Sequence, residues 1–221
     1  MKRTFALIAV ALFATISAAR TPPRDWTTTV GRAPDGAFIV GNPAAKVKLI
    51  EYASYTCPHC AHFAGESEPE LSARIKSGAL NLTFRNAIRD KLDLTAAIAA
   101  RCARTGFLSA SEAIFAAQQT WLPRGADYAN LNDARLSKYP EGDRLKAYAD
   151  GAGLTEMMKA RGLTDAQLDA CYADAAERTT VAALADAAWA TIKGTPSFLV
   201  NGKPVATIQW AELAPMLRAP K

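Results

Sequence analysis

Histidine and cysteine are scarce in this chain of 221 residues, and their scarcity limits its chemistry. The sequence has two histidines and four cysteines. Both histidines and two of the cysteines lie between Cys57 and His62, and side chains so close along the chain cannot easily surround one tetrahedral metal ion. The other two cysteines are far away in the sequence. We therefore expect no metal site and no bound cofactor.

Basic runs with interleaved aromatic residues, internal repeats and low-complexity tracts are also absent. The formal net charge of +5 is spread along the chain, so nucleic acid is not an expected partner. Half of the residues are hydrophobic, which is enough to form a sizeable core.

After residue 19, the sequence has no apolar segment long enough to cross a bilayer. The amino terminus has two basic residues, an apolar segment from Thr4 to Ile16, and then Ser17-Ala18-Ala19. This pattern predicts a secretory signal peptide over residues 1–19, with an uncleaved membrane anchor as the alternative. We expect a soluble mature chain that is exported into oxidising surroundings.

The most informative motif is Cys57-Pro58-His59-Cys60. Thiols at this spacing can close a small disulfide ring and reopen it. The motif follows an apolar run, 47–53, that predicts a buried strand, and it precedes a segment that predicts a helix. The start of a helix favours an anion, so this location should lower the pKa of Cys57 and make it reactive. An inert disulfide or half of a zinc site are the alternatives for such a motif in isolation.

A second motif, Lys193-Gly194-Thr195-Pro196, opens an apolar strand near the carboxy terminus. Together with the cysteine motif, and with Glu51 six residues before Cys57, it resembles the thioredoxin superfamily, and most closely the DsbA family of periplasmic thiol oxidases. The resemblance implies an α/β thioredoxin fold with a large inserted helical domain. It also implies a periplasmic protein thiol:disulfide oxidoreductase that introduces disulfides into secreted proteins.

The two cysteines of the motif have different expected roles. Cys57, at the helix start, should be the attacking and leaving sulfur, and Cys60, one turn inside, the shielded resolving thiol. Pro58 and His59 are the variable dipeptide nearest the Cys57 thiolate. The imidazole of His59 can donate a hydrogen bond to that thiolate or attract it as a cation, and an exposed spacer is the alternative.

Three further site residues follow from the resemblance. It implies a cis peptide bond before Pro196, which would place the backbone of Thr195 beside Cys57, where it can pair with an extended substrate strand. A trans proline at an edge strand is the alternative. The resemblance also implies that Glu51 is a buried acid with a raised pKa that assists proton transfer to and from Cys60, against the alternative of a surface glutamate.

Cys102 and Cys171 are left to pair with each other if Cys57 and Cys60 form a pair. Their bridge would be structural, crossing the helical region and closing a loop of about 70 residues. We expect this disulfide because the compartment is oxidising, and two free buried thiols are the alternative.

The expected organisation is a core interrupted by helices. Residues 20–36 should form a flexible arm, residues 37–90 and 193–221 the thioredoxin-fold core, and residues 91–192 the helical insertion. Within these parts, local signals predict capping boxes at Ser109–Glu112 and Thr164–Gln167, a hairpin at Asn201-Gly202, and helix breaks at Pro69, Pro123–Gly125, Gly151 and Gly153.

The expected partners are reduced secreted proteins and, by resemblance alone, a membrane quinone-linked re-oxidase of the DsbB type. The chain itself should be a monomer. A threonine before this proline, as Thr195 is here, also occurs in isomerases and reductases of the superfamily. These activities therefore remain alternatives. A non-catalytic, chaperone-like module that binds peptides is a third possibility from a different class.

Overall fold

A six-stranded sheet forms the centre of the computed structural model, which describes residues 24–218. The predicted signal peptide lies outside the described residues. The strands are β1 (Val30–Arg32), β2 (Phe38–Gly41), β3 (Val47–Ala53), β4 (Leu80–Asn86), β5 (Ser197–Val200) and β6 (Lys203–Val205). Their order in the sheet is β1-β2-β4-β3-β5-β6. Only β3 and β4 are parallel, so the sheet is mixed, as a thioredoxin fold requires.

The central strand, β3, has the bounds that its apolar sequence predicts. It pairs with β4 on one side and β5 on the other, so Glu51 lies between Phe84 and Phe198. At the carboxyl side of β5, the predicted hairpin is confirmed: Asn201 and Gly202 both have positive φ angles, as a tight two-residue turn needs. The strand that ends at the cysteine motif is thus enclosed within the sheet.

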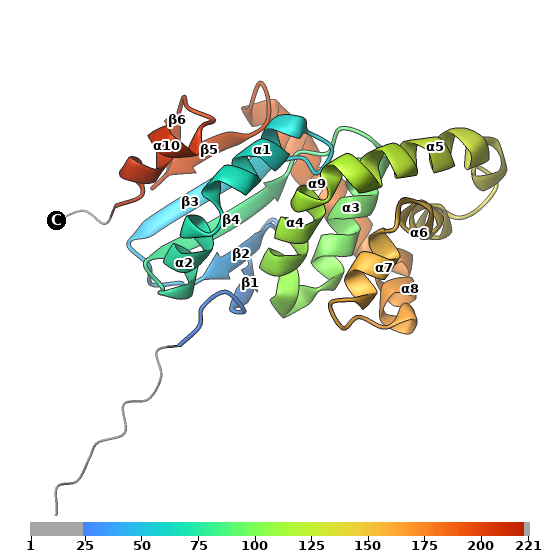
Figure 1. The fold of residues 1–221 in the computed structure, drawn as a ribbon, viewed down its shortest axis with the longest axis horizontal. Coiled ribbons are helices and arrows are strands. Elements are labelled where there is room, and N and C mark those ends of the chain that lie inside the picture. The colour runs from blue at the N-terminus through green and yellow to red at the C-terminus, as the bar shows by residue number, and fades with distance from the viewer. Residues whose placement is uncertain (1–23, 219–221) are drawn as a thin grey trace, which may run out of the picture.

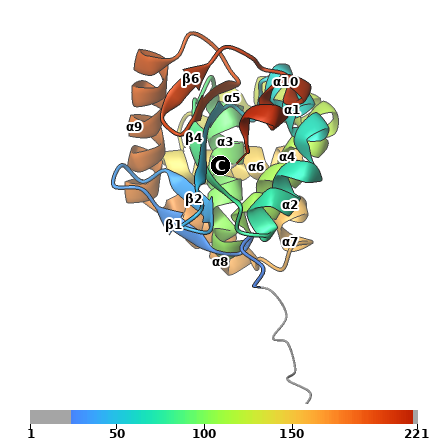
Figure 2. The same ribbon diagram turned by 90° about the vertical axis from the view of Figure 1, so that its left-hand side faces the viewer.

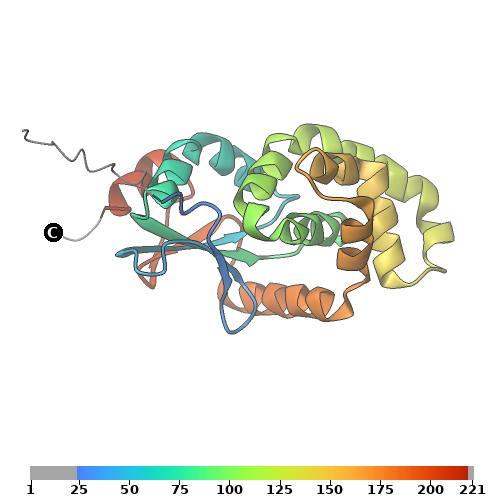
Figure 3. The same ribbon diagram turned by 90° about the horizontal axis from the view of Figure 1, so that it is seen from below.

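Ten α-helices surround the sheet in the part of the chain that the structure describes. They are α1 (Pro58–Ser67), α2 (Glu70–Lys76), α3 (Lys91–Cys102), α4 (Phe107–Ala116), α5 (Gln118–Leu136), α6 (Glu141–Ala152), α7 (Leu154–Lys159), α8 (Asp165–Ala173), α9 (Ala175–Thr191) and α10 (Trp210–Leu213). Helices α1 and α2 lie on one face of the sheet and α9 on the other, while α3 to α8 gather beyond one end of it (Figures 1 and 3). None of the described helices is long and apolar enough to span a membrane.

Within the expected flexible arm, residues 30–32 form β1, an edge strand of the sheet, which corrects that expectation for these residues. Strand β1 pairs with β2 along its whole length, and the two lie together at one edge in Figure 2. Before it, the backbone N–H of Trp26 donates to the Lys76 carbonyl at 3.2 Å, and the indole packs directly against Gly78. The sequence did not predict this strand, because three residues at the edge of a sheet are too few to show an apolar periodicity.

The predicted break at Pro123–Gly125 is wrong, since α5 continues through it. Gly125 is a point of close approach, where an added Cβ would lie 3.0 Å from the Ala152 side chain on α6. Gly151 likewise lies inside α6, against the ring of Tyr128. By contrast, Gly153 does end α6, with a φ of +84°. Glycine in this region therefore serves mainly to let helices pack closely.

The two predicted capping boxes have different outcomes. The capping box at Thr164–Gln167 is confirmed, with both reciprocal hydrogen bonds present at the start of α8. The one at Ser109–Glu112 is wrong, because α4 already begins at Phe107, and the Glu112 carboxylate instead accepts a hydrogen bond from Ser72. Pro69 separates α1 from α2, as predicted.

Cys102 and Cys171 form a disulfide that joins the last residue of α3 to α8. Both residues are only partly buried, and they are separated by 69 positions in the sequence. The bridge closes most of the helical insertion into one loop, so in the chain-entropy view it lowers the entropy of the unfolded state.

Replacing both cysteines, Cys102→Ala with Cys171→Ala, should reduce the free energy of unfolding by about 2–4 kcal/mol, because the unfolded chain regains that loop entropy. Urea unfolding followed by circular dichroism measures the change. The substitutions are best made in a Cys57→Ser/Cys60→Ser background, which prevents disulfide exchange. An unchanged midpoint with an unchanged slope would contradict a stabilising role.

Candidate active site

Cys57 lies at the junction between β3 and α1, where it caps the helix with an extended backbone conformation. Pro58 follows at the first helical position, where a missing N–H costs nothing. No acidic residue lies in the first turn of α1, so the free backbone N–H groups there face the Cys57 sulfur without competition. The helix start is therefore built to hold an anion.

The two thiols of the motif titrate in opposite directions. Hydrogen bonding from the Cys60 side chain is the largest cause that lowers the Cys57 pKa to about 4, with further contributions from the Thr195 side chain and the backbone N–H groups of Cys60 and His59. Burial opposes this shift but is outweighed. The same hydrogen bond and burial raise the pKa of Cys60 far above its usual range. At neutral pH the reduced pair is thus a Cys57 thiolate beside a Cys60 thiol.

The loop between α9 and β5 brings Thr195 against this pair. The Thr195–Pro196 peptide bond is cis. The Thr195 carbonyl lies 3.3 Å from the Cys57 sulfur and accepts its hydrogen bond when the thiol is protonated. Residues 138 positions apart in the sequence are therefore in direct contact, as the second motif suggested.

Two buried side chains that the sequence did not single out hold the segment before Cys57. The Asp93 carboxylate accepts hydrogen bonds from the backbone N–H groups of Tyr55 at 2.8 Å and Arg89 at 3.0 Å. The Gln118 amide donates to the carbonyls of Tyr55 at 2.7 Å and Cys57 at 3.0 Å. Burial raises the pKa of Asp93 to about 7, which reflects how completely it is enclosed.

A third residue, Asp90, does have a sequence signal. It caps α3 by accepting from the N–H groups of Leu92 and Asp93, and it also accepts from the Thr56 hydroxyl at 3.0 Å. An aspartate just before a helical pattern is a typical N-cap, so this helix start was visible in the sequence. Its contact with Thr56, and the roles of Asp93 and Gln118, depend on distant packing and carry no such signal.

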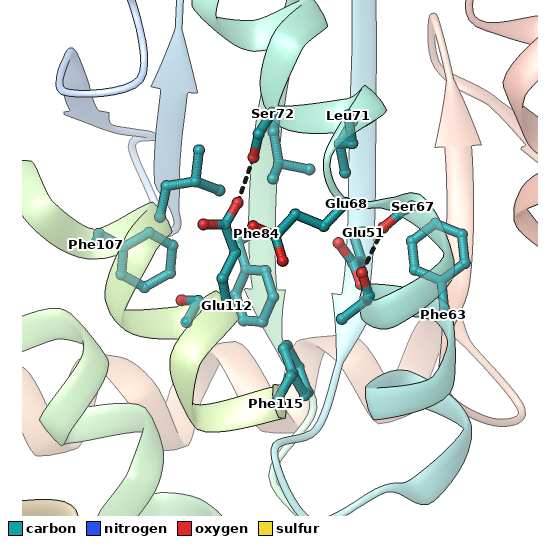
Figure 4. A pocket seen from close by; sticks show the side chains of 14 residues that line it. Glu51, Phe63, Ser67, Glu68, Leu71, Ser72, Phe84, Phe107, Glu112 and Phe115 are labelled. Carbon is teal, nitrogen blue, oxygen red and sulfur yellow. Dashed lines mark hydrogen bonds between the residues drawn. The ribbon is translucent and has the colours of Figure 1, made fainter. Parts of the chain in front are cut away.

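Glu51 is only 5% exposed and lies on β3, and burial raises its pKa to about 8. It borders a cavity of about 40 Å³ whose walls combine phenylalanine rings, such as Phe63 and Phe84, with aliphatic and polar side chains. Figure 4 shows Glu51, Glu68 and Glu112 directed toward this space from different elements. A space of this size with polar groups can hold water. The charge of Glu51 also contributes to the raised pKa of Cys60, which places the two groups close together.

Both histidines lie on the exposed surface of the motif. The His59 ring makes no hydrogen bond to Cys57 within the described residues, although its backbone N–H faces the sulfur. His62 lies 3.7 Å from Glu66 on the same helix. Between residues 24 and 218 there is no cluster of three or more metal-ligating side chains.

Cys57 is reached from solvent through a shallow depression of about 370 Å³. Residues from three separate elements line it: the cysteine motif, the segment before α3, and the end of α9 with the loop that follows. They are Cys57, Pro58, His59, Arg89, Trp189, Lys193, Gly194 and Thr195. The sulfur is thus recessed, with 4% of the residue exposed, yet open to a substrate chain that lies across the depression.

Known proteins match most of the length of this chain. The family model described as Thioredoxin matches residues 34–219. A Rickettsia bellii protein, provisionally named a protein-disulfide oxidoreductase, is 29% identical over 172 residues, which cover 75% of this chain and 57% of that protein. A Rickettsia felis protein with the same provisional name is 31% identical over 173 residues, which cover 76% of this chain and 54% of that protein. The chain thus spans just over half the length of the curated relatives that it matches.

Solved structures give the same picture of the fold. A protein-disulfide isomerase from Novosphingobium aromaticivorans superposes with a TM-score of 0.71 at 34% identity, covering 81% of this chain and 94% of that one. The α-DsbA1 protein of Wolbachia pipientis superposes with a TM-score of 0.65 at 20% identity, covering 87% of this chain and 94% of that one. The second likeness concerns the fold alone.

The family match over residues 34–219, the mixed sheet and the thiol pair at the start of α1 lead to one conclusion. The chain belongs to the thioredoxin family, and it has the fold of the DsbA-like members, with a large helical insertion between β4 and β5.

Proposed function

We propose that this protein is an exported thiol:disulfide oxidoreductase that introduces disulfides into secreted proteins through Cys57 and Cys60. The observation that carries this proposal is the opposite titration of the two thiols, with the Cys57 pKa lowered to about 4 and the Cys60 pKa raised. A stable Cys57 thiolate favours the reduced form of the enzyme. The oxidised form is therefore a strong acceptor of electrons from substrate dithiols.

The reaction begins with the oxidised pair. A substrate thiolate attacks the Cys57 sulfur, forms a mixed disulfide with it and breaks the Cys57–Cys60 bond, so that Cys60 leaves as a thiolate and takes up a proton. The second substrate thiolate then attacks the substrate sulfur of the mixed disulfide and releases Cys57 as a thiolate. The substrate loses two electrons and the enzyme disulfide gains them. Thr195 and Pro196 border the site where the substrate backbone would lie.

Glu51 supplies the proton that Cys60 takes up, and removes it again during re-oxidation. Its raised pKa keeps it protonated at neutral pH, and it borders a cavity that is large enough for water. A group with a pKa near the working pH is the most efficient proton donor and acceptor.

Re-oxidation requires an acceptor for the two electrons. We assign this step to a membrane quinone-linked partner of the DsbB type, on the DsbA-like fold alone. On the same ground, we propose that the protein works in the periplasm and that it is a monomer.

An isomerase or reductase of the same fold is the second candidate, and the solved Novosphingobium aromaticivorans structure has the name of a protein-disulfide isomerase. The redox potential separates the two: a value near −120 mV, as for DsbA, supports an oxidase, and one near −270 mV, as for thioredoxin, supports a reductase or an isomerase that must work reduced. A non-catalytic peptide-binding module would bind unfolded chains without either cysteine.

The first prediction concerns the reactive thiol. Cys57 should alkylate faster than Cys60 at pH 5, because only Cys57 is ionised there. The thiolate absorbance near 240 nm should disappear as pH falls through about 4. Because the folded-state pKa is lowered, the stability that ionisation gives the reduced protein is largest above the ordinary thiol pKa and is gone below about pH 4. Faster alkylation of Cys60 would overturn the assignment.

Variants separate the two roles further. Cys57→Ser should abolish oxidation of a dithiol peptide, whereas Cys60→Ser should accumulate mixed disulfides with it, because no resolving thiol remains. Mass spectrometry of the trapped species provides the measurement.

Glu51→Gln should slow peptide oxidation about tenfold or more, because Cys60 loses its proton donor. The same change should raise the free energy of unfolding by about 1–3 kcal/mol at pH 7–8. The sign follows from the raised pKa: the folded protein holds an extra proton between pH 4.5 and about 8, so its stability falls as pH rises through this range. Stopped-flow fluorescence and urea unfolding at pH 5 and pH 8 provide the measurements.

Glu212→Gln, an exposed change on α10, is the matched control for the Glu51 experiment. An unaltered oxidation rate in Glu51→Gln would rule out proton transfer by this carboxyl group.

His59→Ser should raise the Cys57 pKa and move the potential toward more reducing values by tens of millivolts, since an imidazole or imidazolium stabilises the nearby thiolate. Tens of millivolts correspond to about 1–3 kcal/mol for a two-electron couple. Glutathione equilibration measures the potential. If neither quantity changes, the backbone N–H groups and Thr195 carry the whole effect and His59 is a spacer.

A further inference from the structure

The rim of the depression above Cys57 is positively charged. The cations Arg89 and Lys193 line it from two different elements, with the His59 ring beside them, and all three residues are exposed. Among the described residues, no ion pair joins Arg89 or Lys193 to a carboxylate, and no aspartate or glutamate lines the depression. A substrate chain lying across Cys57 would therefore meet cations in the same depression.

The carboxylates nearest in sequence to this rim do not line the depression and form no ion pair with its cations. Asp90, next to Arg89, accepts three hydrogen bonds at the start of α3, where it serves as the helix cap. Asp93 is fully buried. Asp186, one helical turn before Trp189 on α9, is exposed but does not line the depression.

An aromatic platform lies between these cations. Trp189 is 40% exposed, although a tryptophan on a helix surface is usually covered. Its indole N–H donates to the Ile88 carbonyl at 2.8 Å, so the ring is held in one orientation beside the segment that carries Arg89. A fixed indole among cations can contact an apolar side chain of a bound segment while the cations contact its charges.

We infer that this rim selects extended polypeptide segments with acidic residues flanking the reacting cysteine. The inference rests on the proposed function and adds the substrate class to it. Two physical effects act in the same direction: the cations attract the acidic flanks, and they favour the ionised form of the incoming thiol, which is the attacking species. Because the rim is exposed, both effects should weaken as salt is added.

The test compares three dithiol peptides of equal length that have acidic, neutral or basic residues on both sides of one cysteine. The oxidised enzyme should react with the acidic peptide at a second-order rate constant at least about fivefold above that of the basic peptide at low ionic strength. The ratio should fall toward one in 0.5 M salt. Rate constants are taken per thiolate, after the thiol pKa of each free peptide has been measured.

The variants Arg89→Gln and Lys193→Gln, separately and combined, should reduce the acidic-to-basic ratio. Lys46→Gln is the matched control, because Lys46 is an exposed cation just before β3, at the far end of the strand from Cys57. It should leave the ratio unchanged. Circular dichroism and the glutathione redox potential, measured for each variant, separate a change in selectivity from a change in folding or in oxidising power.

The outcomes distinguish the inference from the proposed function. Equal rates for all three peptides, or a preference that survives the double variant, would overturn the inference and leave the oxidase assignment intact. Failure of the folded, oxidised enzyme to react with any peptide would overturn both.

Discussion

The placement of the Cys57 sulfur at the start of α1, against Thr195, is the constraint on which the site depends. A thiol one residue earlier or later would lose the backbone N–H groups and the hydrogen bond from Cys60 that together lower its pKa. Two buried side chains, Asp93 and Gln118, fix the backbone just before it. Both come from the helical insertion, so the inserted helices take part in building the catalytic junction of the core.

The same junction places unfavourable groups inside the protein. Glu51 and Asp93 are both buried, and burial raises the pKa of each, which means that neither is stabilised as an anion by a cationic partner. Buried carboxyl groups of this kind cost stability as pH rises through their titration range. For Glu51, this cost is consistent with the proton-transfer role that we propose, because a carboxyl group with a pKa of about 8 can exchange protons near neutral pH.

Elsewhere, ion pairs around a largely buried glutamate hold separate elements together. Glu177 on α9 pairs with Arg101 on α3 and Arg32 on β1, each at 2.6 Å. Although burial alone would raise its pKa, the hydrogen bonds from the two guanidinium groups lower it. This network joins the edge of the sheet to the insertion, and the Cys102–Cys171 disulfide joins α3 to α8 nearby. The ion pairs thus connect the insertion to the edge of the sheet, and the disulfide connects two helices within the insertion.

The sequence by itself determined the elements whose signals are local. The mainly apolar strand β3, the Asn201-Gly202 turn, the capping box of α8 and the strand-to-helix position of Cys57 all follow from neighbouring residues, and the structure has them. Tertiary structure decided what depends on distant packing. It set Gly125 against Ala152 inside a continuous helix, and it placed Glu112 toward the cavity of Glu51 and Gln118 beneath Cys57. These contacts join residues far apart in the chain, and periodicity and capping patterns carry information only about neighbours within a few turns.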